Sequence, residues 1–140
     1  MAVSFQILPA RGLVIVTYRG DANVEETMRV FAEYVAHPDF QPGHKQLIDL
    51  TLITGYEKDF VRLMETQAIK AESLVGKGTQ SLMVYLTPTR ISQSMSAMIV
   101  KSWEDVDAVV PLVQHNEADA LAILGQPENS IAELLALVEG

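Results

Sequence analysis

The stretch from Lys45 to Tyr56 constrains the fold of this chain more than any other. Its sequence is KQLIDLTLITGY, in which apolar side chains fill most positions from Gln46 to Leu52 before polar residues and a glycine follow. A strand has such continuous apolar character when helices cover both faces of its sheet. The stretch therefore predicts the central strand of a sheet, at about Gln46 to Leu52, followed by a loop. For Asp49, the one charged residue between Gln46 and Leu52, we expect a structural hydrogen-bonding role rather than that of a base or metal ligand.

A long amphipathic helix is predicted directly after this strand, from about Glu57 to Val75. Its apolar and charged residues recur at spacings of three and four, which places them on separate faces. The inward face is expected to carry Phe60, Val61, Met64, Ala68, Ala71 and Val75, and the outward face Lys58, Arg62, Glu65 and Lys70. Gly76 and Gly78 are expected to end the helix.

The remaining elements alternate between strands and helices. The hydrophobic pattern predicts an antiparallel hairpin of Val3–Leu8 and Leu13–Tyr18, a buried strand at Ser81–Leu86 and a strand at Val106–Val113. Pro111 favours a sheet edge for the last of these, because proline cannot donate a ladder hydrogen bond. Helices are expected after capping signals at Asn23, Thr87–Thr89, Asn116 and Ser130.

This order, β-β-α-β-α-β-α-β-α-α, predicts a single α/β domain over residues 1–140. Right-handed crossovers should make the sheet mostly parallel apart from the N-terminal antiparallel hairpin, with the helices packed on the sheet. At 140 residues and 49% hydrophobic content, the chain is long enough to bury one sizeable core.

Composition excludes several classes of function. A net charge of −8 argues against nucleic acid and anionic membrane surfaces, which need clustered Lys and Arg. The absence of cysteine excludes disulfides and thiolate chemistry, and the three histidines, His37, His44 and His115, match no metal motif. No apolar run approaches the roughly 18 to 20 residues that span a bilayer, and the first residues lack a signal-peptide pattern. We therefore expect a cytoplasmic protein.

Polar residues gather where the strands of the predicted sheet end. In open α/β sheets, ligands bind beyond the carboxyl ends of the strands, near helix N-termini. The candidate binding residues at that edge are Thr51, Thr54, Gly55, Tyr56 and Arg90. The threonines and the N–H groups of the next helix could hold an anion, and Arg90 could reach a carboxylate or phosphate. An ordinary helix cap and a solvated arginine are the alternatives.

Four stretches share a family pattern. They are Gly20-Asp21 before the first helix, His37-Pro38-Asp39-Phe40 with Gly43 after it, Leu47-Ile48-Asp49-Leu50-Thr51 in the central strand, and residues 117–125, EADALAILG. Together with the order of elements, which covers nearly the whole chain, they resemble the STAS fold of anti-sigma-factor antagonists. The resemblance is closer to the SpoIIAA-like relatives of these antagonists, also described as STAS/SEC14-like. It implies a SpoIIAA-like fold and a regulatory role exerted through a protein partner.

In the antagonists, the loop after the central strand carries a phosphorylatable serine in an Asp-Ser-Ser-Gly type motif. Residues 51–55 of this chain, TLITG, contain no serine and no second aspartate. Thr54, next to Gly55, is the nearest equivalent.

Two functions from different classes are compatible with these features. The first is a non-enzymatic regulatory or protein-interaction domain, whose partner surface is the helix after Gly55 with its preceding loop. That surface could also pair two copies into a homodimer. The second is a small-molecule or lipid-binding module with an apolar pocket. An enzyme ranks third, because no nucleophile with a base and no cofactor-binding motif can be assembled.

The two leading functions predict different structures. The regulatory domain needs an exposed patch and no cavity. The binding module needs a largely apolar pocket of a few hundred Å³ between the helices that carry Phe60–Met64 and Met95–Met98. The methionines that could line such a pocket, or simply fill the core, are Met28, Met64, Met83, Met95 and Met98.

Overall fold

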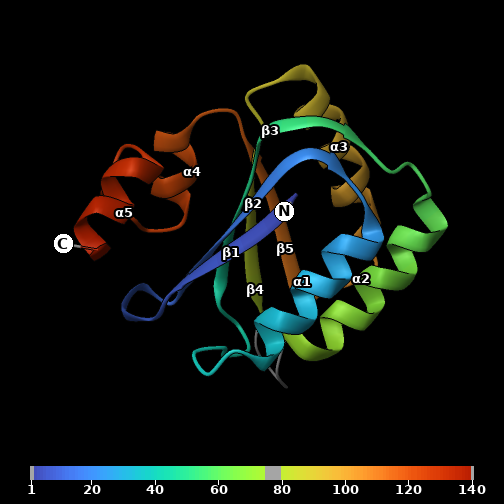
Figure 1. Cartoon of the computed structure of the whole chain (residues 1–140), viewed down its shortest axis with the longest axis horizontal. Helices are drawn as coiled ribbons and strands as arrows, with labels where there is room; N and C mark the ends of the chain where they lie inside the picture. Colours follow the sequence, from blue (N-terminus) through green and yellow to red (C-terminus); the bar gives the residue numbers. More distant parts are fainter. Residues whose placement is uncertain (1, 75–79, 140) are drawn as a thin grey trace.

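A computed structural model describes residues 2–74 and 80–139 and shows a mixed β-sheet with helices packed on it (Figure 1). The strands are β1 (Val3–Leu8), β2 (Leu13–Ala22), β3 (Lys45–Tyr56), β4 (Ser81–Leu86) and β5 (Val109–Gln114). The helices are α1 (Val24–Ala36), α2 (Phe60–Leu74), α3 (Arg90–Ser102), α4 (Glu117–Ile123) and α5 (Ile131–Glu139), and a 3-10 turn, Pro9–Arg11, joins β1 to β2. The predicted order of elements is confirmed.

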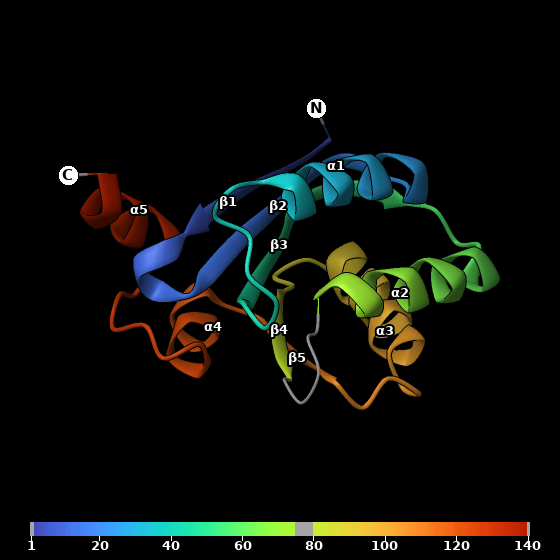
Figure 2. The same ribbon diagram turned by 90° about the horizontal axis from the view of Figure 1, so that it is seen from below.

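The sheet has the strand order β1-β2-β3-β4-β5. β1 and β2 are antiparallel and the other pairs are parallel, which confirms the predicted fold class and the central place of β3. β5, which contains Pro111, lies at the edge as expected. Each parallel crossover moves one strand further in the same direction, so right-handed connections place α1, α2 and α3 on one face. Figure 2 shows these three helices on one side of the sheet and α4 and α5 on the other.

Two apolar cores lie on opposite faces of the sheet. The larger contains Ile48 and Leu50 of β3 and residues of α1 and α3, and the smaller contains Leu47 of β3 with Leu121 of α4 and Leu134 of α5. Successive side chains of a strand point to opposite faces, so Leu47 and Ile48 belong to different cores. This double burial explains why the first half of β3 carries apolar residues on both of its faces.

The carboxyl-terminal half of β3 was predicted as a loop, and that prediction is wrong. Residues 52–56 pair with residues 19–22 of β2, a stretch that also has a loop-like sequence. β4 pairs only as far as Asp49, so beyond that point the two strands form a two-stranded extension. Two register shifts accompany it, and Gly20 has a φ of +69°, a backbone conformation that glycine adopts without strain.

Helix α2 differs from the prediction in its start and in its orientation. It begins at Phe60, and the carboxylate of Asp59 accepts a hydrogen bond from the amide of Arg62 at 3.0 Å. Thr66 and Gln67 are buried, Lys70 faces inward, and the side chains predicted to face inward are exposed in three cases: Val61, Met64 and Ala68. Val75, Gly76 and Gly78 lie outside the described residues.

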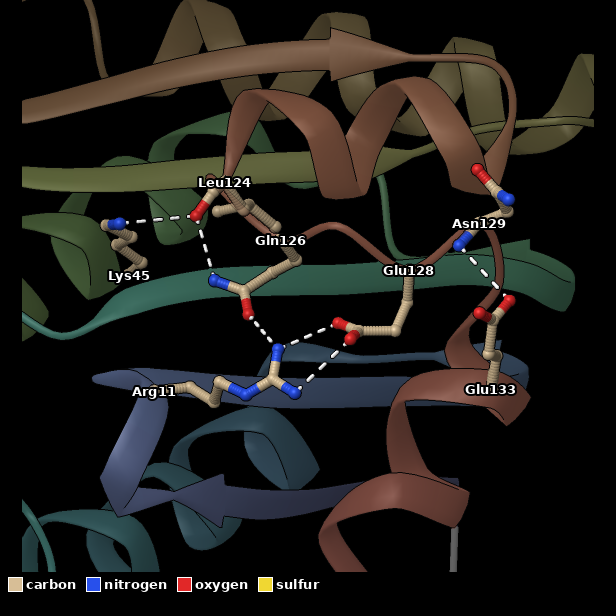
Figure 3. Close-up of polar contacts among 7 residues, drawn as sticks. All are labelled: Arg11, Lys45, Leu124, Gln126, Glu128, Asn129 and Glu133. Carbon is tan, nitrogen blue, oxygen red and sulfur yellow. Dashed lines mark hydrogen bonds and ion pairs between the residues drawn. The ribbon is translucent and has the colours of Figure 1, made fainter.

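The α4–α5 unit is tied to the β1–β2 hairpin by Arg11 (Figure 3). Its guanidinium donates to Gln126 Oε1 at 2.7 Å and to both carboxylate oxygens of Glu128, at 2.7 and 3.3 Å. The hydrogen bond from Arg11 lowers the pKa of the Glu128 carboxyl. Lys45 adds a bond to the carbonyl oxygen of Leu124 at 3.2 Å, which holds the end of α4 near the start of β3.

We expect Glu128→Gln to lower the thermal unfolding midpoint at pH 7. Because the folded-state pKa of Glu128 is depressed below its ordinary value of 4.5, the stabilisation is present above pH 4.5 and is lost as the pH falls through the folded-state pKa. Circular-dichroism melts from pH 7 to pH 3 should show the gap between wild type and variant closing on acidification. Glu104→Gln, at an exposed position, is the control, and a constant gap would contradict the assignment.

Candidate functional site: an apolar cavity beneath helix α2

A cavity of about 100 Å³ lies between the sheet and the three helices α1, α2 and α3. It occupies the place predicted for an apolar pocket, because Leu63 of α2 and both Met95 and Met98 of α3 line it. Met83 of β4 lines it as well. Two further methionines behave differently from the prediction. Met64 is exposed on the outer side of α2, and Met28 is not part of the lining.

The cavity exists because α2 does not rest on the sheet. α1 and α3 contact the strands, whereas the main contacts of α2 are with α1 and α3. Side chains from the three helices and from the strands therefore line the space beneath α2.

Aromatic side chains form much of the cavity wall, and their polar atoms have partners. The Tyr18 and Thr27 hydroxyls lie 3.2 Å apart, and Trp103 Nε1 donates to the Tyr85 hydroxyl at 3.0 Å. Tyr34 forms a 3.1 Å hydrogen bond with His44 Nδ1. Burial raises the pKa of Tyr18 and Tyr85, and raises that of Tyr34 to about 12. These hydroxyls therefore stay protonated at neutral pH and are already engaged.

Two polar residues of α2 line the cavity without such full pairing or solvation: Gln67 has an unpaired acceptor, and the Lys70 amine is desolvated. The Gln67 side chain is 2% exposed, and its Nε2 donates to Ser102 Oγ at 3.1 Å. Its Oε1 is buried and has no hydrogen-bond partner among the described residues. Lys70 keeps part of its side chain exposed, yet desolvation lowers its pKa to about 8, and its Nζ lies 6.0 Å from the centre of the Phe31 ring. Lys70 was predicted to face outward, and Gln67 was not among the predicted site residues.

A second, open depression of about 560 Å³ lies at the end of the β2–β3 extension. Four of the five predicted site residues line it, namely Thr54, Gly55, Tyr56 and Arg90, together with Asp21, Lys58, Ile91 and Ser94. The Tyr56 and Ser94 hydroxyls lie 2.7 Å apart, and Lys58 Nζ lies 5.5 Å from the Tyr56 ring centre. Four of the residues predicted for the site therefore lie together, three of them on a strand rather than in a loop.

The predicted anion site at a helix N-terminus does not form in this depression. Thr54 lies within β3, and Asp59 rather than Thr54 caps α2. The first turn of α3 is closed by a reciprocal cap between Thr89 and Ser92. An anion in so open a depression would keep much of its hydration and be screened by salt.

The fifth predicted residue, Thr51, is separate from both cavities. Its amide and its hydroxyl donate to Asp49 Oδ1 at 2.9 and 2.5 Å, next to a register shift between β2 and β3. Asp49 thus satisfies a backbone amide at an irregular part of the ladder, as the structural expectation required.

Over residues 2–74 and 80–139, no three His, Asp or Glu side chains group as metal ligands would. His37 Nδ1 instead accepts the amide proton of Asp39 at 3.0 Å, a contact within a turn. No helix in this described part is both long enough and apolar enough to cross a bilayer.

We expect Lys70→Met to raise the free energy of unfolding at pH 7 by about 1 kcal/mol, allowing for the partial exposure of the side chain. The folded-state pKa of about 8 lies below the ordinary value of 10.5, so the unfolded chain binds the extra proton between these values. Wild-type stability should therefore rise relative to the variant from pH 8 to pH 10.5. Urea unfolding across this range measures the difference, with exposed Lys58→Met as the control. A pH-independent difference would contradict the buried amine.

In comparisons with known proteins, no family model matches the chain. No curated protein matches it either. The resemblance to SpoIIAA-like domains therefore stays a prediction from the sequence.

Proposed function

We propose that this protein binds a small, largely apolar molecule in the cavity beneath α2. The observation that carries the proposal is the cavity itself, which lies inside the larger core and is lined mostly by apolar and aromatic side chains. Protein cores are normally packed with few voids larger than a water molecule. A void of about 100 Å³ among packed strands and helices costs stability unless a ligand uses it.

The volume limits the size of the ligand. A dry cavity of about 150 Å³ is enough to hold benzene. The cavity of this protein, at about 100 Å³, is smaller than that, so it suits a molecule somewhat smaller than one ring, or one ring if the lining repacks. Met83, Met95 and Met98 supply flexible side chains that could adapt in this way. This size is smaller than the few hundred Å³ expected from the sequence.

The position of α2 also supports a binding role. Because α2 packs on other helices rather than on the sheet, it can shift without breaking the sheet ladder. Its inner side carries the polar residues Thr66, Gln67 and Lys70, a composition that is unfavourable for simple core packing. Cavities that bind ligands typically combine apolar walls with a few polar groups.

We expect toluene to raise the thermal unfolding midpoint of the wild-type protein, with a stabilisation of about 1.4 kcal/mol when its concentration is tenfold above its Kd. Val30→Phe should abolish this effect, because Val30 of α1 is buried and lines the cavity. The matched control is Val61→Phe, the same substitution on the exposed side of α2, which should keep the toluene effect. An absence of any toluene effect on wild type would count against the proposal.

A second candidate function is the regulatory or protein-interaction domain that the STAS-like resemblance implies. It is favoured by the outer face of α2, where Val61, Met64 and Ile69 are exposed by 66%, 40% and 54%. Large apolar side chains grouped on one exposed helix face mark interaction surfaces. The partner we propose is a protein, with a second copy of this chain as the simplest case. A cytoplasmic location belongs to the same proposal.

We expect the double variant Val61→Lys/Ile69→Lys to remain folded, with a change in stability of no more than about 0.5 kcal/mol, because both side chains are exposed. Sedimentation velocity over a range of concentrations should show self-association of wild type and its loss in the variant. The control is Leu137→Lys, an exposed apolar position on α5. Figure 1 shows α5 far from α2. If the wild-type protein is monomeric at every concentration, self-association is ruled out and the proposed partner is a different protein.

A further inference from the structure

The side-chain amide of Gln67 is fixed in orientation by Ser102 of α3. Ser102 Oγ donates its one proton to the carbonyl oxygen of Ile99 at 2.5 Å, so it can only accept a hydrogen bond from Gln67. The Gln67 atom 3.1 Å from Ser102 Oγ must therefore be the amide nitrogen. This leaves the amide oxygen, Oε1, buried at the other corner of the group and unpaired with any described residue.

A buried acceptor without a donor is costly, and buried polar groups are rarely left in this state. Gln67 is one of the residues that line the cavity. A donor held in the cavity therefore lies beside this side chain. Lys70 lies one turn further along α2 and lines the same cavity. Residues three positions apart on a helix are neighbours on its surface, so the two side chains are close together.

We propose that the cavity selects an apolar molecule bearing a hydroxyl group, and that Gln67 and Lys70 hold this hydroxyl. Its proton is donated to Gln67 Oε1, and its oxygen accepts a hydrogen bond from Lys70 Nζ. This inference rests on the proposed ligand-binding function and adds the chemical class of the ligand. Phenols and short-chain alcohols of about one ring in size belong to that class.

Other polar groups fit this pair of side chains less well. A carboxylate, ether or ketone offers acceptors only and would leave Gln67 Oε1 unpaired. An ammonium group would donate to Oε1 but would be repelled by the neighbouring Lys70 cation. A hydroxyl donates and accepts through one oxygen, which suits an acceptor and a donor that lie one turn apart. The aromatic walls, including Tyr18, Phe31 and Tyr85, favour a planar ring as the apolar part.

Phenol and toluene are a matched pair of probes, because a hydroxyl in one replaces a methyl group in the other. Their Kd values are measured by NMR titration of the full chain, in wild type and in two variants. Gln67→Met keeps the length of the side chain and removes both polar atoms of the amide. Thr66→Val is the control, since Thr66 is another buried polar residue of α2 that lines the cavity.

We expect the ratio of the toluene Kd to the phenol Kd to fall roughly tenfold in Gln67→Met relative to wild type. In Thr66→Val the ratio should stay within about twofold of wild type. A ratio unchanged in Gln67→Met, or reduced equally in both variants, would overturn the hydroxyl assignment while leaving toluene binding as support for the proposed function. If neither probe binds wild type, the proposed function fails and this inference fails with it. Gln67→Leu serves in the same way if Gln67→Met does not fold.

Discussion

The width of the sheet determines how the rest of the molecule is arranged. Neighbouring strands lie about 4.8 Å apart, so five strands span roughly 19 Å, and a helix with its side chains is about 10 Å wide. Two helices fill such a face. Three successive crossovers in one direction nevertheless place α1, α2 and α3 on the same side. Since α1 and α3 contact the strands, α2 has to pack in the groove between them, and the space under it is the cavity.

This arrangement also explains which parts of the structure could be predicted from the sequence. The boundaries of β4, the caps at Asn23 and Thr89 and the edge position of β5 follow from local rules and are confirmed. The inner face of α2 was predicted wrongly because Leu63, Thr66, Gln67 and Lys70 recur at helical spacing as regularly as the apolar residues do. Periodicity shows that a helix has two faces, but a helix in an outer layer does not have to turn its apolar face inward.

The residues of the two candidate sites could be predicted from the sequence to different degrees, because some are brought together by topology alone and others only by tertiary packing. Thr54, Gly55, Tyr56 and Arg90 come together because the carboxyl ends of parallel strands share one edge, a rule that needs only the topology. The β2–β3 extension was missed because each of its strands has the composition of a loop and becomes a strand only by pairing with the other. Gln67 could not be found from the sequence, since its importance lies in an absent partner, and only three-dimensional packing shows which atoms lack one.

The side chains of Gln67 and Lys70, beneath α2, each lower the stability of a fold whose other local features agree with one another. A sequence selected only for packing would place apolar side chains at positions 67 and 70, because an unpaired acceptor and a desolvated amine both oppose folding. Conflicts of this kind concentrate at functional sites. The same helix presents Val61, Met64 and Ile69 on its outer side, so both candidate surfaces belong to one element. If a ligand beneath α2 changes the affinity of its outer face for a protein, that protein must change the affinity for the ligand by the same factor.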